Sequence, residues 1–103
     1  MADYQLSPEA DDDLLGVARD TIKKWGEEQA DLYEGKLRSC FESIEGGKAR
    51  PRQLLKSRPE LLLIRCEHHY VFYRLRKVQP SLIIAVFHEN MDLMKRLRDR
   101  LDS

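Results

Sequence analysis

Apolar residues recur at helical spacing in the first half of the chain and form shorter patterns in the second half. Between residues 8 and 45 they lie three or four positions apart, which predicts two amphipathic helices. Ser7 is a favourable N-cap for the first helix, and Gly26 suits its C-terminal end. Gly46-Gly47 ends the second helix. Because the connection between the two helices is so short, we expect an antiparallel helical hairpin.

Each predicted helix carries one apolar stripe, and we expect both stripes to face the core. The stripe of the first helix consists of Ala10, Leu14, Val17, Ala18, Ile22 and Trp25. The stripe of the second consists of Ala30, Tyr33, Leu37, Cys40, Phe41 and Ile44. With the strands described next, these stripes predict that six side chains are largely buried: Trp25, Tyr33, Phe41, Phe72, Val86 and Phe87.

The remaining pattern is that of β-strands. "YQL" at residues 4–6 alternates like a short edge strand, and further strands are predicted at 61–66, 69–76 and 81–88. The unbroken apolar run at 81–88 is typical of a central strand that is covered on both faces. Short connections join the last three strands, which predicts an antiparallel meander. A turn is expected at Glu67-His68, although it lacks the usual Gly, Asn or Asp.

The last segment predicts a helix, with Met94, Leu97 and Leu101 at helical offsets and Asn90 or Asp92 as the cap. The whole pattern predicts one α+β domain over residues 1–103. Its small antiparallel β-sheet, a short N-terminal strand plus a three-strand meander, is combined with an N-terminal helical hairpin and a C-terminal helix.

Composition limits the class of protein. Apolar residues make up 42% of the 103 residues, which is typical of a globular chain. The 18 basic residues equal the 18 acidic ones, which argues against a dedicated nucleic-acid-coating protein. Neither an export signal nor a membrane span is visible, so we expect a cytoplasmic protein. Cys40 and Cys66 are accordingly expected to be reduced thiols, with Cys40 filling a small site in the core.

The stretch "KARPRQLLKSRPE" at 48–60 is strongly basic, with two prolines and one acidic residue, and an irregular connector is predicted over 48–58. Its cations are Lys48, Arg50, Arg52, Lys56 and Arg58. They are either a solvated loop or a patch that meets an acidic partner or a phosphate backbone.

The stretch "CEHHYVFYR" at 66–74 places four ligand-type side chains in a row. Neighbouring residues of a strand point to opposite faces, so His68 and His69 do not chelate one ion from a regular strand. Cys66 and His68 share a face, but a structural zinc site needs four ligands. We therefore expect no metal, and no sequence motif indicates a cofactor.

A nuclease is the alternative that the polar residues leave open. A general acid, a general base and a phosphate clamp are the groups that RNA cleavage needs. The residues available on the strands are His88, Glu89, Arg65, Arg74 and Tyr73. The same residues serve equally as solvated strand ends and a partner interface, and we favour that interpretation and expect no catalytic residue.

Four stretches in order resemble the ParE toxins of the RelE/ParE toxin–antitoxin superfamily: "YQLSPEADDDL", "WGEEQADLYEGKL", "HHYVFYR" and "FHENMDLMKRL". The resemblance covers nearly the whole chain. Residues 65–101 are especially similar to a ParE of a broad-host-range plasmid stabilisation system. One departure is the turn at Glu67-His68, where relatives often have Gly.

The resemblance implies a RelE/ParE-like fold. It also implies a toxin that inhibits DNA gyrase and blocks replication, as part of a system that stabilises a plasmid or chromosome. It implies a ParD-type antitoxin with a ribbon-helix-helix domain, which binds the toxin through its tail and alone contacts operator DNA. A ribosome-dependent mRNA endoribonuclease of the RelE type and a non-toxic interaction module remain the alternatives.

The resemblance also directs attention to two sets of residues. For the antitoxin we expect contacts in a groove beside the helical hairpin, at Leu14, Leu15, Ile22, Leu32, Tyr33, Leu37, Arg65 and Arg74. For gyrase we expect contacts through basic residues of the last helix and the connector, at Lys95, Arg96, Arg98, Arg100, Arg50, Arg52 and Arg58.

Overall fold

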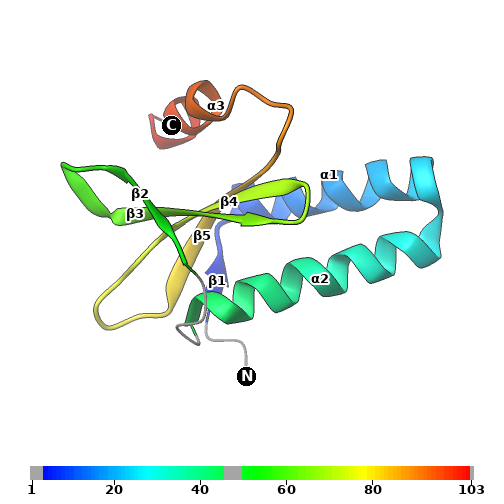
Figure 1. The fold of residues 1–103 in the computed structure, drawn as a ribbon, viewed down its shortest axis with the longest axis horizontal. Coiled ribbons are helices and arrows are strands. Elements are labelled where there is room, and N and C mark those ends of the chain that lie inside the picture. The colour runs from blue at the N-terminus through cyan, green and yellow to red at the C-terminus, as the bar shows by residue number, and fades with distance from the viewer. Residues whose placement is uncertain (1–3, 46–49, 103) are drawn as a thin grey trace.

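Three helices and five strands make up the fold (Figure 1), a computed structural model that describes residues 4–45 and 50–102. The elements in chain order are β1 (Tyr4–Leu6), α1 (Pro8–Trp25), α2 (Glu27–Glu45), β2 (Arg52–Leu55), β3 (Arg58–Cys66), β4 (His69–Arg74), β5 (Ser81–His88) and α3 (Leu93–Leu101). Across the described residues, no helix combines the length and the hydropathy that crossing a bilayer requires.

The strands form one mixed sheet in the order β1-β5-β4-β3-β2. The predicted meander is confirmed, because β3, β4 and β5 pair antiparallel as successive neighbours. The prediction of a purely antiparallel sheet is wrong at one edge, where β1 pairs parallel to β5 with Tyr4 opposite Ser81. The parallel pairing arises because the chain leaves β1 through the helical hairpin and returns to β5 only after the other strands.

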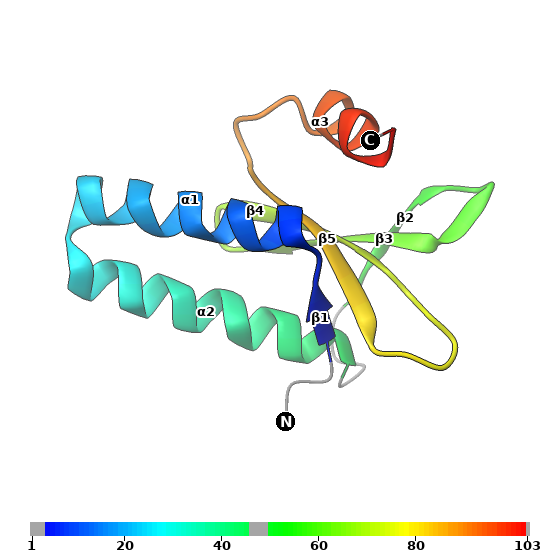
Figure 2. The ribbon, with the colours of Figure 1, turned by 180° about the vertical axis from the view of Figure 1, so that it is seen from behind.

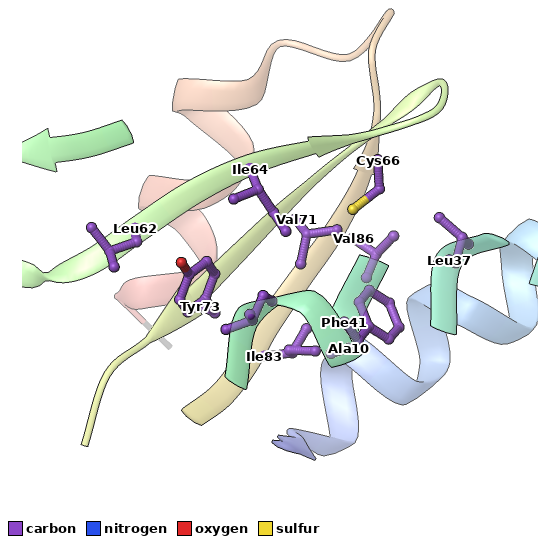
Figure 3. Packing of buried hydrophobic residues seen from close by; sticks show 11 residues of the cluster. Ala10, Leu37, Phe41, Leu62, Ile64, Cys66, Val71, Tyr73, Ile83 and Val86 are labelled. Atoms are coloured by element: carbon purple, nitrogen blue, oxygen red, sulfur yellow. The ribbon is translucent and has the colours of Figure 1, made fainter. Parts of the chain in front are cut away.

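The helical hairpin covers one face of the sheet and α3 packs on the other (Figure 2). On the hairpin side, Phe41 and Leu37 of α2 meet Val71 of β4 and Val86 of β5 (Figure 3). On the other side, Leu97 of α3 joins a cluster that includes Phe72, Phe87 and Ile84. Successive side chains of β4 therefore alternate between two apolar layers, with Val71 and Tyr73 on the hairpin side and Phe72 on the α3 side.

The helix ends follow from local chemistry. The Ser7 hydroxyl accepts a hydrogen bond from Ala10 N at 3.1 Å, and Gly26 closes α1 with φ of 90°, which favours glycine. Asp92 caps α3 by accepting from Lys95 N at 3.3 Å. These capping predictions are confirmed, whereas the predicted helix end at Gly46-Gly47 lies outside the described residues.

The turn between β3 and β4 lies at Glu67-His68, as predicted, and it uses an unusual residue. Glu67 adopts φ of 56°, a left-handed conformation that costs a non-glycine residue free energy. A residue of α2 stabilises this turn: the Tyr33 hydroxyl accepts a hydrogen bond from His68 N at 3.1 Å.

The prediction of an irregular connector over 48–58 is wrong for its second half; Lys48 lies outside the described residues. Arg52–Leu55 forms the edge strand β2, and β3 begins at Arg58, three residues earlier than expected. An edge strand needs only backbone pairing on one side, so its side chains remain charged and in water. For this reason the charged side chains of this segment did not indicate a strand.

The predicted core is right for the sheet and wrong for the closed end of the hairpin. Phe41, Phe72, Val86 and Phe87 are buried, and Tyr33 is partly buried. Trp25, however, is 71% exposed. In both views the closed end of the hairpin extends past the strands, so no sheet lies under this part of α1 (Figures 1 and 2).

Two further apolar residues that were predicted to lie on buried helix faces are exposed in the structure. Ile22, one turn before Trp25, and Met94 in α3 are both exposed. Leu97 is the buried residue of α3, and Leu101 is partly buried.

The expectation of two reduced thiols is wrong, because Cys40 of α2 and Cys66 of β3 form a disulfide with their Cα atoms 6.1 Å apart. The pairing depends on α2 passing the end of β3, and a spacing of 26 residues in the sequence does not reveal that approach.

Candidate functional site

A cleft of about 910 Å³ lies between α1, α3 and the adjoining ends of β4 and β5. We call it the α1–α3 cleft. Exposed Trp25 and Leu32 border it from the hairpin, and Arg96 borders it from α3. Three histidines, His68, His69 and His88, also line it.

A tyrosine–histidine pair lies on the wall of this cleft. The Tyr33 hydroxyl lies 2.6 Å from His69 Nδ1, and the same oxygen already accepts from His68 N. These two atoms share one hydrogen bond, whose donor is set by the His69 tautomer. Burial lowers the pKa of His69 to about 4, and the neighbouring His88 and His68 act in the same direction. Burial likewise raises the pKa of Tyr33, so both groups are neutral at pH 7.

The His69 pair predicts a pH dependence of stability. The unfolded chain binds a proton at His69 near pH 6.5, whereas the folded chain does so only near pH 4. Stability from this group is therefore complete above about pH 6.5 and declines as the pH falls, by about 3 kcal/mol at pH 4. In chemical denaturation from pH 4 to 8, His69→Gln should show a flatter curve than the wild type. A His68→Gln control tests the exposed neighbour, and parallel curves for wild type and His69→Gln would contradict the assignment.

Glu89 organises a second, exposed group beside the β3–β4 turn. Its Oε2 accepts from Arg65 Nη2 at 2.9 Å and lies 3.3 Å from His68 Nδ1. The Arg65 guanidinium also stacks over the Tyr70 ring at 5.5 Å. Because Arg65 and His68 are largely exposed, these ion pairs contribute little free energy. They shape the surface next to the cleft.

The five residues of the nuclease alternative do not form one constellation. His88, Glu89 and Arg65 lie at one end of the sheet, where His88 pairs with His69. Arg74 pairs with Leu82, five positions along the same strand pair, which corresponds to about 16 Å. Tyr73 is buried in the core on the hairpin side. Among the described residues, no group of three or more His, Cys, Asp or Glu side chains is placed to hold a metal ion.

Asp13 and Arg100 join three elements at the base of the cleft. Asp13 Oδ2 of α1 accepts from Val86 N of β5 at 2.9 Å and from Arg100 Nη1 of α3 at 2.9 Å. Arg100 Nη2 reaches Asp13 Oδ1 at 3.1 Å, and Arg100 Nη1 also donates to Ile84 O at 2.8 Å. The Asp13 carboxylate is therefore a structural link between α1, β5 and α3 and not a solvated charge.

The structure gives Arg100 an internal role, although the sequence placed it among the gyrase-binding residues. The other cations of that set lie on the surface. Lys95, Arg96 and Arg98 are exposed on α3, and Arg50 and Arg52 are exposed on and before β2. Arg58, partly buried, pairs with Glu60 at 3.0 Å.

A smaller hollow of about 250 Å³ lies between α1 and α2, and we call it the hairpin groove. Leu14, Leu15, Tyr33 and Phe41 line it. Leu15 is 52% exposed, as a binding residue requires, whereas Leu37 also lines the groove but is almost fully buried in the core. The main role of Leu37 is therefore packing in the core, and its expected role in antitoxin binding is secondary.

The rest of the expected antitoxin set is dispersed. Leu32 is 57% exposed but borders the α1–α3 cleft, not the hairpin groove, and Ile22 is exposed near the closed end of the hairpin. Arg65 lies at the β3–β4 turn and Arg74 at the opposite end of β4. The Arg74 Nε atom is buried and lacks a hydrogen-bond acceptor among the described residues.

Comparison with known proteins gives a consistent result. A family model described as the ParE toxin of the type II toxin–antitoxin system parDE matches residues 4–93. Toxin ParE of Escherichia coli is 42% identical over 101 residues, which are 98% of each chain. Toxin ParE1 of Mycobacterium tuberculosis is 30% identical over 97 residues, 91% of this chain and 96% of the relative.

A solved structure titled as a chromosomal ParDE toxin–antitoxin system from P. aeruginosa has the same fold. The match has a TM-score of 0.69 and covers 82% of this chain and 92% of that chain. At 12% identity it supports the fold alone.

Proposed function

Because the chain belongs to the ParE toxin family of type II toxin–antitoxin systems, we propose that it inhibits DNA gyrase and thereby blocks replication. The inhibition is by binding, without a catalytic residue. A ParD-type antitoxin with a ribbon-helix-helix domain neutralises the toxin in a hetero-oligomer, and only the antitoxin contacts operator DNA. The balanced charge of the toxin supports this division of roles.

The observation that carries the proposal is the separation of the residues that a nuclease would need. Acid–base cleavage requires its groups within hydrogen-bond reach of one phosphate. The β4–β5 register instead places His88 and Arg74 at opposite ends of the strand pair, and Tyr73 is buried. A binding surface needs no such constellation.

The basic surface offers the gyrase contacts. Exposed Lys95, Arg96 and Arg98 project from α3, and Arg50, Arg52 and Arg58 lie on or near β2. Arg100 supports this surface indirectly, because its bonds to Asp13 hold α3 in place.

A pair of assays tests the proposal. The purified toxin is added to a gyrase supercoiling reaction and, in parallel, to a translation reaction whose mRNA is mapped for cleavage. We expect lost supercoiling and intact mRNA. Reversal of Lys95, Arg96 and Arg98 to Glu should relieve inhibition, whereas Lys77→Glu in the β4–β5 loop serves as a control. Cleaved mRNA with normal supercoiling would establish the RelE-type alternative.

The antitoxin tail is proposed to fold on binding and to place apolar side chains in the hairpin groove. The exposed Leu15 supports this site. Acidic side chains of the tail are proposed to meet Arg65, Arg74 or the basic residues of the connector, where charge adds more to the association rate than to the affinity. Because a tail wraps around its partner, we expect the interface to exceed about 1,600 Å² in total.

Two leucines test whether the antitoxin uses the helical hairpin. Leu15→Asp with Leu32→Asp should weaken antitoxin binding by at least about 100-fold, because each charge is placed in an apolar contact. Both side chains are more than half exposed, so the toxin should remain folded. Calorimetric titration measures the affinity, and Val78→Asp, exposed in the β4–β5 loop, is the control. Full affinity in a folded double variant would move the interface off the hairpin.

A further inference from the structure

The disulfide between Cys40 and Cys66 links the two layers of the molecule. Cys40 lies on α2, in the layer of the helical hairpin, and Cys66 is the last residue of β3 in the sheet. The bond closes a loop of 26 residues that contains β2 and most of β3. Such a cross-link restricts the unfolded chain and opposes the departure of α2 from the sheet.

We propose that the Cys40–Cys66 pair is a thiol–disulfide switch that controls how firmly α2 is held against the sheet. A switch needs a fold that persists in both states. Leu37 and Phe41, on either side of Cys40 in the sequence, are buried in the core and anchor α2 without the bond. Tyr33 adds a second tie through its bonds to His68 and His69.

The reduced state also fits the packing. Cys66 is 3% exposed and belongs to the apolar cluster between the hairpin and the sheet (Figure 3). Cys40 is partly buried against the same cluster. A free cysteine behaves as a small apolar side chain, so two thiols here leave no unsatisfied polar group of consequence. Reduction should therefore loosen α2 without dissolving the core.

Residue Cys40 is more exposed than residue Cys66, which indicates how exchange proceeds with a small thiol such as glutathione. Its thiolate attacks Cys40 Sγ, the Cys40–Cys66 bond breaks, and Cys66 leaves as a thiolate that takes up a proton. A second glutathione thiolate attacks the glutathione sulfur of the mixed disulfide and releases Cys40. Two glutathione molecules are oxidised to glutathione disulfide, two electrons reduce the protein bond, and the reverse sequence restores it.

The switch acts on a helix that contributes to the hairpin groove. Tyr33 and Phe41 line that groove from α2, and Cys40 directly precedes Phe41. An effect of the redox state on antitoxin binding rests on the proposed function, whereas the effect on α2 itself does not.

The test equilibrates the purified toxin in glutathione buffers of increasing oxidised fraction, traps free thiols by alkylation and measures intact mass and thermal melting. We expect a reversible bond. The reduced protein should keep its circular dichroism spectrum and melt about 10 °C or more below the oxidised protein. Hydrogen exchange should become faster in α2 on reduction, with β4 and β5 little changed.

The control is the double variant Cys40→Ala with Cys66→Ala, which should melt near the reduced wild type and respond to no redox buffer. Three results would overturn the proposal. The first is that the thiols stay open to alkylation at every glutathione ratio, and the second is that the two states melt at the same temperature. A reduced protein that is unfolded would show that the bond is an obligatory part of the fold and not a switch.

Discussion

Replacing Phe41 with alanine is expected to remove about 3–5 kcal/mol from the free energy of unfolding. Phe41 is 1% exposed and lies where α2 meets the sheet. Its ring also contacts the Tyr4 ring of β1 edge to face at 5.4 Å. Alanine leaves a cavity among Val71, Val86 and Leu37, which belong to different elements and do not collapse easily into it.

The loss is large because a domain of this size has only about 5–15 kcal/mol of stability. Urea unfolding of both proteins measures it. Leu32→Ala is the matched control, because Leu32 lies on the same helix but is exposed, so its truncation should change stability by no more than about 0.5 kcal/mol. Equal losses for the two variants would show that α2 does not present Phe41 to the core.

The elements that the sequence predicted best are those with a strong local signal. The β5 strand is an apolar run with ends that match the structure, and α1 begins directly after Ser7, whose hydroxyl accepts from the free backbone N–H of Ala10 in the first turn. The edge strand β2 was missed because only its backbone pairs, and its side chains carry charge like a loop. Trp25 was misplaced because periodicity reports a helix face but not whether a sheet lies beneath it.

For the candidate site, the sequence predicted properties of single residues, such as exposure, but not which residues lie next to each other. Leu15 and Leu32 lie off the predicted apolar stripes, and both are exposed in the structure. The bond between Cys40 and Cys66 depends on which helix passes which strand, and no local pattern contains that information. The Tyr33–His69 pair likewise joins residues 36 positions apart. In the sequence, only the polar run at 66–69 pointed to this pair, because nothing within the strand itself explains why these residues are polar.

Replacing Asp13 with alanine is expected to cost about 3 kcal/mol, the second large effect. The carboxylate accepts from Val86 N and bonds Arg100 in a bidentate manner, and both side chains of the pair are largely buried. Alanine leaves a backbone N–H and a guanidinium without their acceptor, and removing one partner of a buried pair costs more than the pair is worth. Arg100 keeps its bond to Ile84 O and its contact with the Phe87 ring, which limits the loss.

The loss should be concentrated at α3, because the Asp13–Arg100 pair connects α3 to α1. Hydrogen exchange should therefore become faster in α3 than in β4, and urea unfolding gives the total. Asp12→Ala is the matched control, since Asp12 is the adjacent acid of the same turn and is exposed. In a double-mutant cycle, Asp13→Ala with Arg100→Met should cost less than the two single changes added. Additive losses, or an Asp12 effect as large as that of Asp13, would mean that the bridge does not hold α3.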